Sequence, residues 1–139
     1  MAFSAHAFHP PPKDSSGAVR RRSKVKVLVV DDMADIRSLV RYALMARCDH
    51  AVVEAGSAEE AISQAPLTEP DIILLDVMMP GMSGCEALPE LRRLCPDATI
   101  VICSGMSDLI DPRPDGADHA IAKSVDFVDR ILEIVLPGA

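Results

Sequence analysis

Aromatic side chains are nearly absent from this 139-residue sequence: they make up 3% of it, and there is no Trp. Hydrophobic residues nevertheless reach 49%, so a core built from Val, Ile, Leu and Met is expected. The length fits one domain and leaves no room for two well-packed ones. No stretch approaches the ~20 apolar residues that span a bilayer, and the N-terminus lacks the basic-then-apolar pattern of a secretory signal. The sequence therefore predicts a soluble, cytoplasmic protein without a membrane span.

Closely spaced cysteines are also missing. Cys48, Cys85, Cys95 and Cys103 form no Cys-x-x-Cys pair, and the histidines are scattered along the chain. Zinc sites and disulfide frameworks need such spacing or a short secreted context, so neither is expected. We predict reduced, partly buried thiols.

The formal charge of −7 is unevenly distributed. Residues 1–24 carry five basic residues and one acid, whereas residues 25–139 carry 9 basic and 20 acidic residues, a formal charge of −11. Such an acidic body is repelled by a phosphate backbone, so direct nucleic-acid binding is not expected. Residues 1–24 are basic and rich in Pro, show no apolar periodicity, and are interpreted as a flexible leader. Contact of this leader with an acidic partner or lipid, or a start codon assigned too far upstream, are alternatives that the sequence leaves open.

From residue 25 onward, buried-strand patterns alternate with helical patterns. Continuous apolar runs are typical of parallel strands buried on both faces, and apolar spacings of three and four residues predict helices between them. The predicted strands are residues 27–30, 51–54, 71–76, 99–103 and 120–122, and the predicted helices are 36–47, 57–64, 85–94 and 125–135. This order predicts an α/β fold with a doubly wound, five-stranded parallel sheet.

Two features of these helices are specific enough to check. Ser57 is predicted to cap the second helix, with Glu60 as its capping-box partner. The apolar stripes that should face the sheet include Leu39 in the first helix and begin at Val125 in the last.

Five residues suited to phosphate and metal chemistry stand where predicted strands end. Asp31 and Asp32 follow the first strand, Asp76 ends the third, Ser104 follows the fourth and Lys123 follows the fifth. Ligand sites in such sheets lie outside the carboxyl ends of the strands, so these side chains should converge. A single acid there is usually a solvated loop residue, but five suitable residues together are hard to produce by chance. Clustered carboxylates favour a hard divalent cation, and Mg²⁺ suits this set because it takes oxygen ligands from one or two carboxylates.

Four motifs in a fixed order support this interpretation. They are Val27-Leu28-Val29-Val30-Asp31-Asp32, Leu74-Leu75-Asp76-Val77-Met78-Met79-Pro80-Gly81-Met82-Ser83-Gly84, Ile102-Cys103-Ser104-Gly105, and Gly116-Ala117-Asp118 leading to Lys123. Together they resemble the receiver domain of two-component response regulators, of the stand-alone, chemotaxis-regulator-like kind. The resemblance covers residues 25–137 and implies the flavodoxin-like receiver fold.

The resemblance implies a phosphoprotein that binds magnesium. Asp76 would be the phosphoacceptor, modified by the phosphohistidine of a sensor histidine kinase or of a histidine phosphotransfer protein. Mg²⁺ would be bound by Asp32, Asp76 and the backbone carbonyl of Met78, with Asp31 supporting the ion largely through water.

The other motif residues are implied to contact the phosphoryl group. Lys123 would pair with the acyl phosphate, Ser104 would turn inward to hydrogen-bond it, and Gly105 would leave the approach open. The only chemistry implied is Mg²⁺-dependent phosphotransfer to the protein's own Asp76, assisted by Lys123, and slow autodephosphorylation. The protein would therefore not be an enzyme acting on other substrates. Met78 and Met106 would border the path of the hydrolytic water and make it apolar.

Three departures from the family fall in the region that usually signals. Ala120 stands where receivers commonly carry Tyr or Phe, and Ser124 follows the Lys where Pro is usual. The span from residue 104 to 123 is about one helical turn shorter than expected and contains Pro112 and Pro114. The fourth helix is therefore predicted to be short, over residues 107–110, or replaced by a loop. A dimer of the common type through this face is not expected.

The favoured hypothesis is a single-domain response regulator that contacts a downstream protein target or passes phosphate along a phosphorelay. A receiver excised from a hybrid kinase, and a phosphorylation-independent binding module with a receiver fold, are the alternatives. A hydrolase of the haloacid dehalogenase type is disfavoured, because Asp31-Asp32-Met33-Ala34 lacks the Asp-x-Asp of that class.

Overall fold

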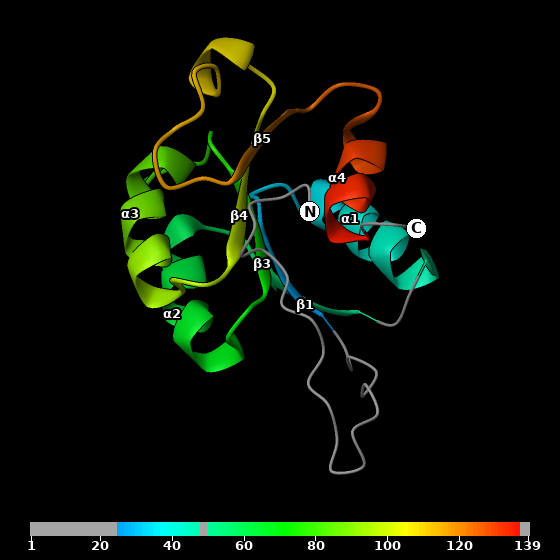
Figure 1. Cartoon of the computed structure of the whole chain (residues 1–139), viewed down its shortest axis with the longest axis horizontal. Coiled ribbons are helices and arrows are strands. Elements are labelled where there is room, and N and C mark those ends of the chain that lie inside the picture. Colours follow the sequence, from blue (N-terminus) through cyan, green and yellow to red (C-terminus); the bar gives the residue numbers. More distant parts are fainter. Residues whose placement is uncertain (1–24, 48–49, 137–139) are drawn as a thin grey trace, which may run out of the picture.

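Strands and helices alternate along the chain in the computed structural model, which describes residues 25–47 and 50–136 (Figure 1). The strands are β1 (Lys26–Val30), β2 (Ala51–Ala55), β3 (Ile72–Asp76), β4 (Thr99–Ser104) and β5 (His119–Ala122). The helices are α1 (Ala34–Arg47), α2 (Ala58–Thr68), α3 (Gly84–Leu94) and α4 (Phe127–Val135), with a single 3₁₀ turn, η1, at Ser107–Leu109. The predicted leader, residues 1–24, and Cys48 lie outside the described residues.

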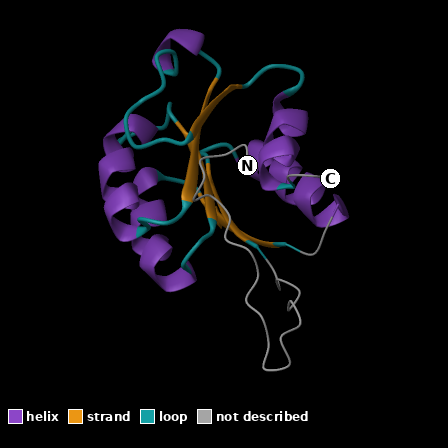
Figure 2. Ribbon diagram, viewed as in Figure 1, coloured by secondary structure: helices purple, strands orange, loops and turns teal. Residues whose placement is uncertain are grey.

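The five strands form one parallel sheet in the order β2-β1-β3-β4-β5. Helices α2 and α3 cover one face of this sheet and α1 and α4 the other, so the sheet is the middle layer of three (Figures 1 and 2). The predicted doubly wound, five-stranded α/β fold is confirmed. No helix in the described part of the chain is long and apolar enough to cross a membrane.

Alternate residues of each strand enter two separate hydrophobic cores. Leu28 and Ile73 point into the core under α2 and α3, whereas Val29 and Leu74 point into the core under α1 and α4. All four side chains are buried. A strand with apolar residues on both faces can be stable only between two helical layers, and this requirement explains the continuous apolar runs in the sequence.

Helix α2 is longer than predicted, ending at Thr68 rather than at residue 64. Pro66 lies inside its last turn, where its missing N–H removes one helical hydrogen bond, and the buried Ala65 continues the apolar stripe. The chain then leaves the helix through Glu69, at φ 49°. Ser57 caps the helix as predicted, by accepting the Glu60 N–H; the Glu60 carboxylate, however, accepts the Gly56 N–H instead of that of Ser57.

Two apolar positions predicted to face the sheet do not do so. Leu39 of α1 is 48% exposed, at the edge of a stripe whose buried members are Val40 and Leu44. Val125 lies in the turn before α4 and is fully exposed, and Phe127 supplies the first buried side chain of that helix instead. For Leu39 the spacing fitted the helix, but the packing of α1 on the sheet selected Val40 and Leu44. Val125 fitted the spacing but lies before the helix begins.

The segment between β4 and β5 contains one turn of 3₁₀ helix in place of a fourth regular helix, as its short length and prolines predicted. Arg92 of α3 holds the far end of this segment. Its Nη2 donates to the Gly116 carbonyl at 2.8 Å and to Asp118 Oδ2 at 2.8 Å, and its Nη1 donates to the Ala98 carbonyl at 2.7 Å. The segment is therefore fixed to α3 close to where β5 begins.

The packing of α3 leads to a prediction about stability. Leu91 of α3 is fully buried, whereas Leu67 of the neighbouring α2 is 84% exposed. Leu91→Ala should lower the free energy of unfolding by roughly 2–5 kcal/mol in urea denaturation, because it leaves a cavity in the core. The matched control Leu67→Ala should change it by no more than about 0.5 kcal/mol. Equal losses in the two variants would contradict the assignment of the core.

Candidate functional site

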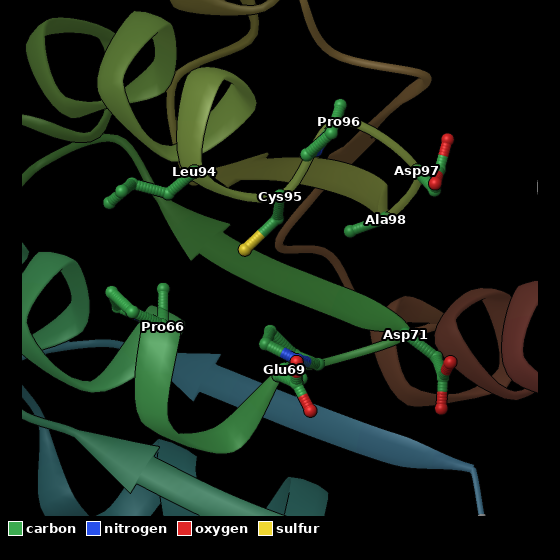
Figure 3. A pocket seen from close by; sticks show the side chains of 10 residues that line it. Pro66, Glu69, Asp71, Leu94, Cys95, Pro96, Asp97 and Ala98 are labelled. Atoms are coloured by element: carbon green, nitrogen blue, oxygen red, sulfur yellow. The ribbon is translucent and has the colours of Figure 1, made fainter.

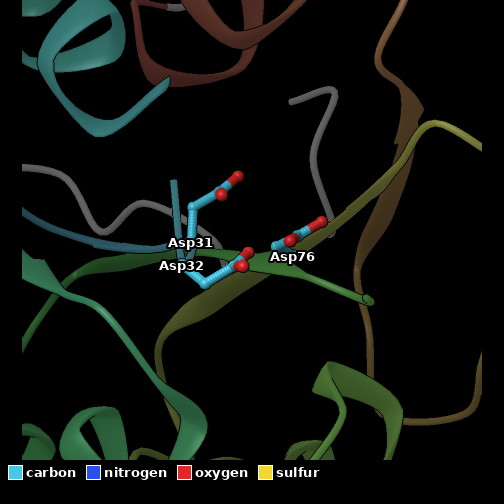
Figure 4. Close-up of side chains that lie close together, drawn as sticks. All are labelled: Asp31, Asp32 and Asp76. Atoms are coloured by element: carbon cyan, nitrogen blue, oxygen red, sulfur yellow. The ribbon is translucent and has the colours of Figure 1, made fainter. Parts of the chain in front are cut away.

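Three carboxylates meet at the carboxyl edge of the sheet (Figure 4). Asp31 and Asp32 directly follow β1, and Asp76 is the last residue of the adjacent β3. One carboxylate oxygen of each residue lies within 4.8 Å of the others. Asp31 and Asp76 are buried and Asp32 is exposed, so the cluster opens to solvent on the side of Asp32. The convergence expected from the strand ends is what the structure shows.

Lys123 joins two of these carboxylates. Its Nζ lies 2.6 Å from Asp31 Oδ2 and 2.9 Å from Asp76 Oδ1, and its own N–H donates to the Ser104 carbonyl at 2.8 Å. Burial alone would lower the pKa of Lys123, but the hydrogen bonds to Asp31 and Asp76 outweigh it and the pKa is raised. Lys123 is therefore a fixed positive charge in the pocket.

One ammonium does not balance three carboxylates. Burial raises the pKa of Asp76; the hydrogen bond from Lys123 opposes this shift, and the charges of Asp31 and Asp32 add to it. A cation with oxygen preference would relieve the repulsion, and Mg²⁺ fits a site with two or three clustered carboxylates open to water. The donor set thus fits magnesium.

The other predicted site residues surround this cluster. Ser104, the last residue of β4, is fully buried, and its Oγ accepts the Met106 N–H at 3.0 Å, which leaves its O–H able to donate. At Gly105 an added Cβ would meet no atom within 4 Å, so this position is open. Met78 and Met106 are 56% and 47% exposed. The roles assigned to these residues stay predictions.

Gly84 belongs to one of the four sequence motifs, but the sequence alone assigned it no role. A Cβ at this position would lie 2.0 Å from the Asp76 carbonyl oxygen, so α3 begins in direct contact with the backbone of Asp76. The start of α3 is fixed by a full capping box between Ser83 and Glu86, and the Gly84 N–H donates to the Val77 carbonyl at 2.9 Å. The sequence offered only a weak signal, because a glycine permits a close backbone approach but does not identify the segment that approaches.

The thiol of Cys103 lies beside the site. Cys103 pairs with Asp76 across β3 and β4 and is buried, and burial raises its pKa to about 12. Cys85 and Cys95 are also free, and burial raises the pKa of each. None of these three thiols has the lowered pKa of a reactive cysteine, which agrees with the prediction of reduced, partly buried thiols.

A cavity of about 440 Å³ lies at the opposite edge of the sheet, between the ends of α2 and α3 (Figure 3). Glu69, Asp71 and Asp97 line it, and the Cys95 sulfur points into it. Asp71 Oδ2 accepts the Lys26 N–H at 2.9 Å and so helps to hold β1 beside β3. The cavity is at the amino edge of the strands, away from the carboxylate cluster.

Comparisons with known proteins agree with this site. The family model of the response regulator receiver domain matches residues 27–135. The chain is 33% identical over 118 residues to chemotaxis protein CheY of Listeria monocytogenes, covering 83% of this chain and 98% of that protein. It is 35% identical over 109 residues to the nitrate/nitrite response regulator protein NarL of Escherichia coli, covering 76% of this chain and 50% of that protein. The structure of response regulator protein TrrA of Thermotoga maritima in complex with Mg²⁺-BeF matches with a TM-score of 0.72 at 32% identity, covering 80% of this chain and 96% of that one.

The contact of Gly84 with Asp76 can be tested by adding one methyl group. Alanine is the better helix former by up to about 1 kcal/mol, yet Gly84→Ala should lower the free energy of unfolding by about 1–3 kcal/mol, because the Cβ displaces the Asp76 backbone. Gly105→Ala, where a Cβ meets nothing within 4 Å, is the matched control and should leave stability nearly unchanged. A stabilised Gly84→Ala variant would disprove the close approach.

The raised pKa of Asp76 predicts a pH-dependent effect on stability. A raised folded pKa means that stability is highest below the unfolded pKa of ~3.9 and is lost as the pH rises through the folded pKa. Asp76→Asn should therefore increase the free energy of unfolding at neutral pH in chelator, and this gain should vanish at pH values below the unfolded pKa. Asp97→Asn, at an exposed acid on the opposite edge, should give no such gain. A loss of stability in Asp76→Asn would mean that the pairing with Lys123 outweighs burial.

Proposed function

Since the chain belongs to the response regulator receiver domain family, we propose that it accepts a phosphoryl group on Asp76 and signals through protein–protein contact. The phosphodonor is a sensor histidine kinase or a histidine phosphotransfer protein. The observation that carries the proposal is the position of the Asp76 carboxylate. It lies 2.9 Å from the Lys123 ammonium and is grouped with the carboxylates of Asp31 and Asp32 at the carboxyl edge of the sheet.

In the transfer step, an Asp76 carboxylate oxygen attacks the phosphorus of a phosphohistidine. The new P–O bond forms as the P–N bond breaks, and the imidazole nitrogen leaves with the electron pair. The raised pKa of Asp76 makes its carboxylate a more basic nucleophile, while Lys123 offsets the negative charge of the acyl phosphate. The Ser104 hydroxyl is placed at the end of the neighbouring strand to donate to a phosphoryl oxygen.

Asp32, Asp76 and the Met78 carbonyl would hold Mg²⁺, with Asp31 behind them. Both carboxylate oxygens of Asp31 already accept hydrogen bonds, from Met33 N–H at 2.9 Å and from Lys123 Nζ at 2.6 Å, which supports an indirect role for Asp31. When bound, Mg²⁺ neutralises phosphoryl oxygens during transfer. The Mg²⁺-BeF complex of the similar TrrA protein supports this assignment.

The chemistry proposed is confined to the protein's own Asp76, without turnover of other substrates. The exposed side chains of Met78 and Met106 follow Asp76 and Ser104 by two residues each, and would make the path of the hydrolytic water apolar. Hydrolysis of the phosphoaspartate should accordingly be slow.

The downstream partner is proposed to be a protein rather than a nucleic acid, because residues 25–139 carry a formal charge of −11. The surface that reads out phosphorylation is unusual. A hollow of about 380 Å³ lies over Ala120 and Ala122, bordered by Ile110 and Arg130, in the place of a larger side chain. This hollow is the observation that favours the second candidate, a phosphorylation-independent binding module.

Phosphorylation can be measured directly. The protein incubated with Mg²⁺ and acetyl phosphate, or with a phosphorylated histidine kinase, should gain one phosphoryl group by intact-protein mass spectrometry. Asp76→Asn should abolish the adduct, because the nucleophile is lost, and Asp97→Asn should keep it. The adduct should also disappear in chelator. An unmodified wild-type protein with both donors, or an adduct that survives Asp76→Asn, would refute the proposal and favour the binding module.

A further inference from the structure

We infer that Arg37 of α1 is a positioning residue that holds the Asp31–Asp32 turn in the geometry that the metal site needs. This inference rests on the proposed function, because it assumes that the carboxylate cluster binds Mg²⁺ for phosphorylation of Asp76. It concerns the backbone behind the carboxylate cluster (Figure 4), not a group that touches the phosphoryl donor.

The Arg37 guanidinium bridges two elements of the fold. Its Nη1 donates to the backbone carbonyl of Asp31 at 2.7 Å, and its Nε donates to Glu54 Oε1 of β2 at 3.0 Å. The side chain is 19% exposed, so these bonds are largely shielded from water. A planar guanidinium that is held by a carboxylate has little freedom, and it therefore fixes the orientation of the carbonyl that it contacts.

The Asp31 carbonyl is the group at which β1 leaves the sheet. The Asp31 N–H still belongs to the ladder and donates to the Ala55 carbonyl at 3.1 Å. On the other side, the carboxylate of Asp31 is fixed by Met33 N–H and Lys123. Arg37 supplies the remaining hydrogen bond and thereby fixes the peptide plane between Asp31 and Asp32.

Rotation of that peptide plane would redirect Asp32. The Asp32 side chain is exposed, and in the described residues the pairing of β1 with β3 ends at Val30 and Leu75, so it does not extend to Asp32 and Asp76. Because Mg²⁺ demands near-ideal octahedral geometry, a small change in the direction of Asp32 should weaken binding. Glu54 offsets the charge of the guanidinium, so Arg37 acts on the position of the ligands more than on the net charge of the pocket.

Arg41 is a natural control one helical turn further along α1. Its Nη1 donates to the Val52 carbonyl at 2.9 Å, and its Nε lies 3.3 Å from Glu54 Oε2. Arg37 and Arg41 thus make the same two kinds of contact, a carbonyl hydrogen bond and an ion pair with Glu54. They differ in that Arg37 contacts Asp31 and in exposure, which is 19% for Arg37 and 41% for Arg41.

The experiment compares Arg37→Met, Arg37→Lys and Arg41→Met in three measurements: Mg²⁺ affinity by calorimetric titration, the rate of phosphorylation by acetyl phosphate, and urea unfolding in chelator. Arg37→Met should weaken Mg²⁺ binding by roughly 10–100-fold, as expected for loss of an outer-shell partner, and slow phosphorylation in parallel at subsaturating Mg²⁺. Arg37→Lys should recover part of the affinity, because an ammonium can reach the carbonyl without bridging to Glu54 as well. Arg41→Met should change stability comparably to Arg37→Met and leave Mg²⁺ affinity within about twofold of wild type.

Two results would overturn the inference: unchanged Mg²⁺ affinity in Arg37→Met, or equal losses of Mg²⁺ affinity in Arg37→Met and Arg41→Met. Either would reduce Arg37 to a residue that packs α1 on β2. If Arg37→Met does not fold, Arg37→Lys decides the question: a Mg²⁺ affinity no weaker than that of Arg41→Met would overturn the inference. Wild-type protein that binds Mg²⁺ but is not phosphorylated would refute the proposed function alone, because the affinities of the variants would still test Arg37.

Discussion

The Lys123 ammonium lies between two buried carboxylates, 2.6 Å from Asp31 and 2.9 Å from Asp76, and the rest of the site depends on this arrangement. Burial and like charge both oppose ionisation of Asp76, and Lys123 is the group within the protein that opposes them. The remaining excess of negative charge gives the pocket its preference for a cation. The raised pKa of Asp76 implies that ionising this carboxyl costs stability in the unliganded fold.

The sheet and two of its helices hold these charged side chains together through their backbone. Parallel strands buried on both faces bring Asp31, Asp76 and Ser104 to one edge, because their carboxyl ends all lie on the same side of the sheet. Gly84 lets α3 begin against the Asp76 backbone, and Arg37 reaches the backbone of Asp31 from α1. The chain at the carboxyl ends of β1 and β3, which bear the clustered carboxylates, is thus supported by the helix that follows each strand.

The sheet and the membership of the site could be predicted from the sequence, because both depend on local patterns. An apolar run such as Ile72 to Leu75 requires burial on both faces, and the residue that ends it must lie at the carboxyl edge. Features that depend on how elements approach one another could not be predicted in this way. The contact at Gly84 and the bond from Arg37 to Asp31 depend on how helices approach the strands, and the exposure of Val125 depends on where α4 begins. No periodicity encodes either. The end of α2 at Thr68 also could not be predicted, because residues 65–68 add only one buried side chain, Ala65, to the apolar stripe.

The attachment of the 111–118 region to α3 by Arg92 has a mechanical consequence. Under the proposed function, phosphorylation would displace the Ser104 hydroxyl. Beyond Ser104 the chain passes through η1 and is then held at Gly116 and Asp118 by hydrogen bonds from Arg92. The segment between Ser104 and Gly116 is short, and it contains one 3₁₀ turn but no α-helix that could move as a rigid body. A displacement near Ser104 would therefore be taken up around Ile110, and the surface that changes shape would be small and close to the carboxylate cluster.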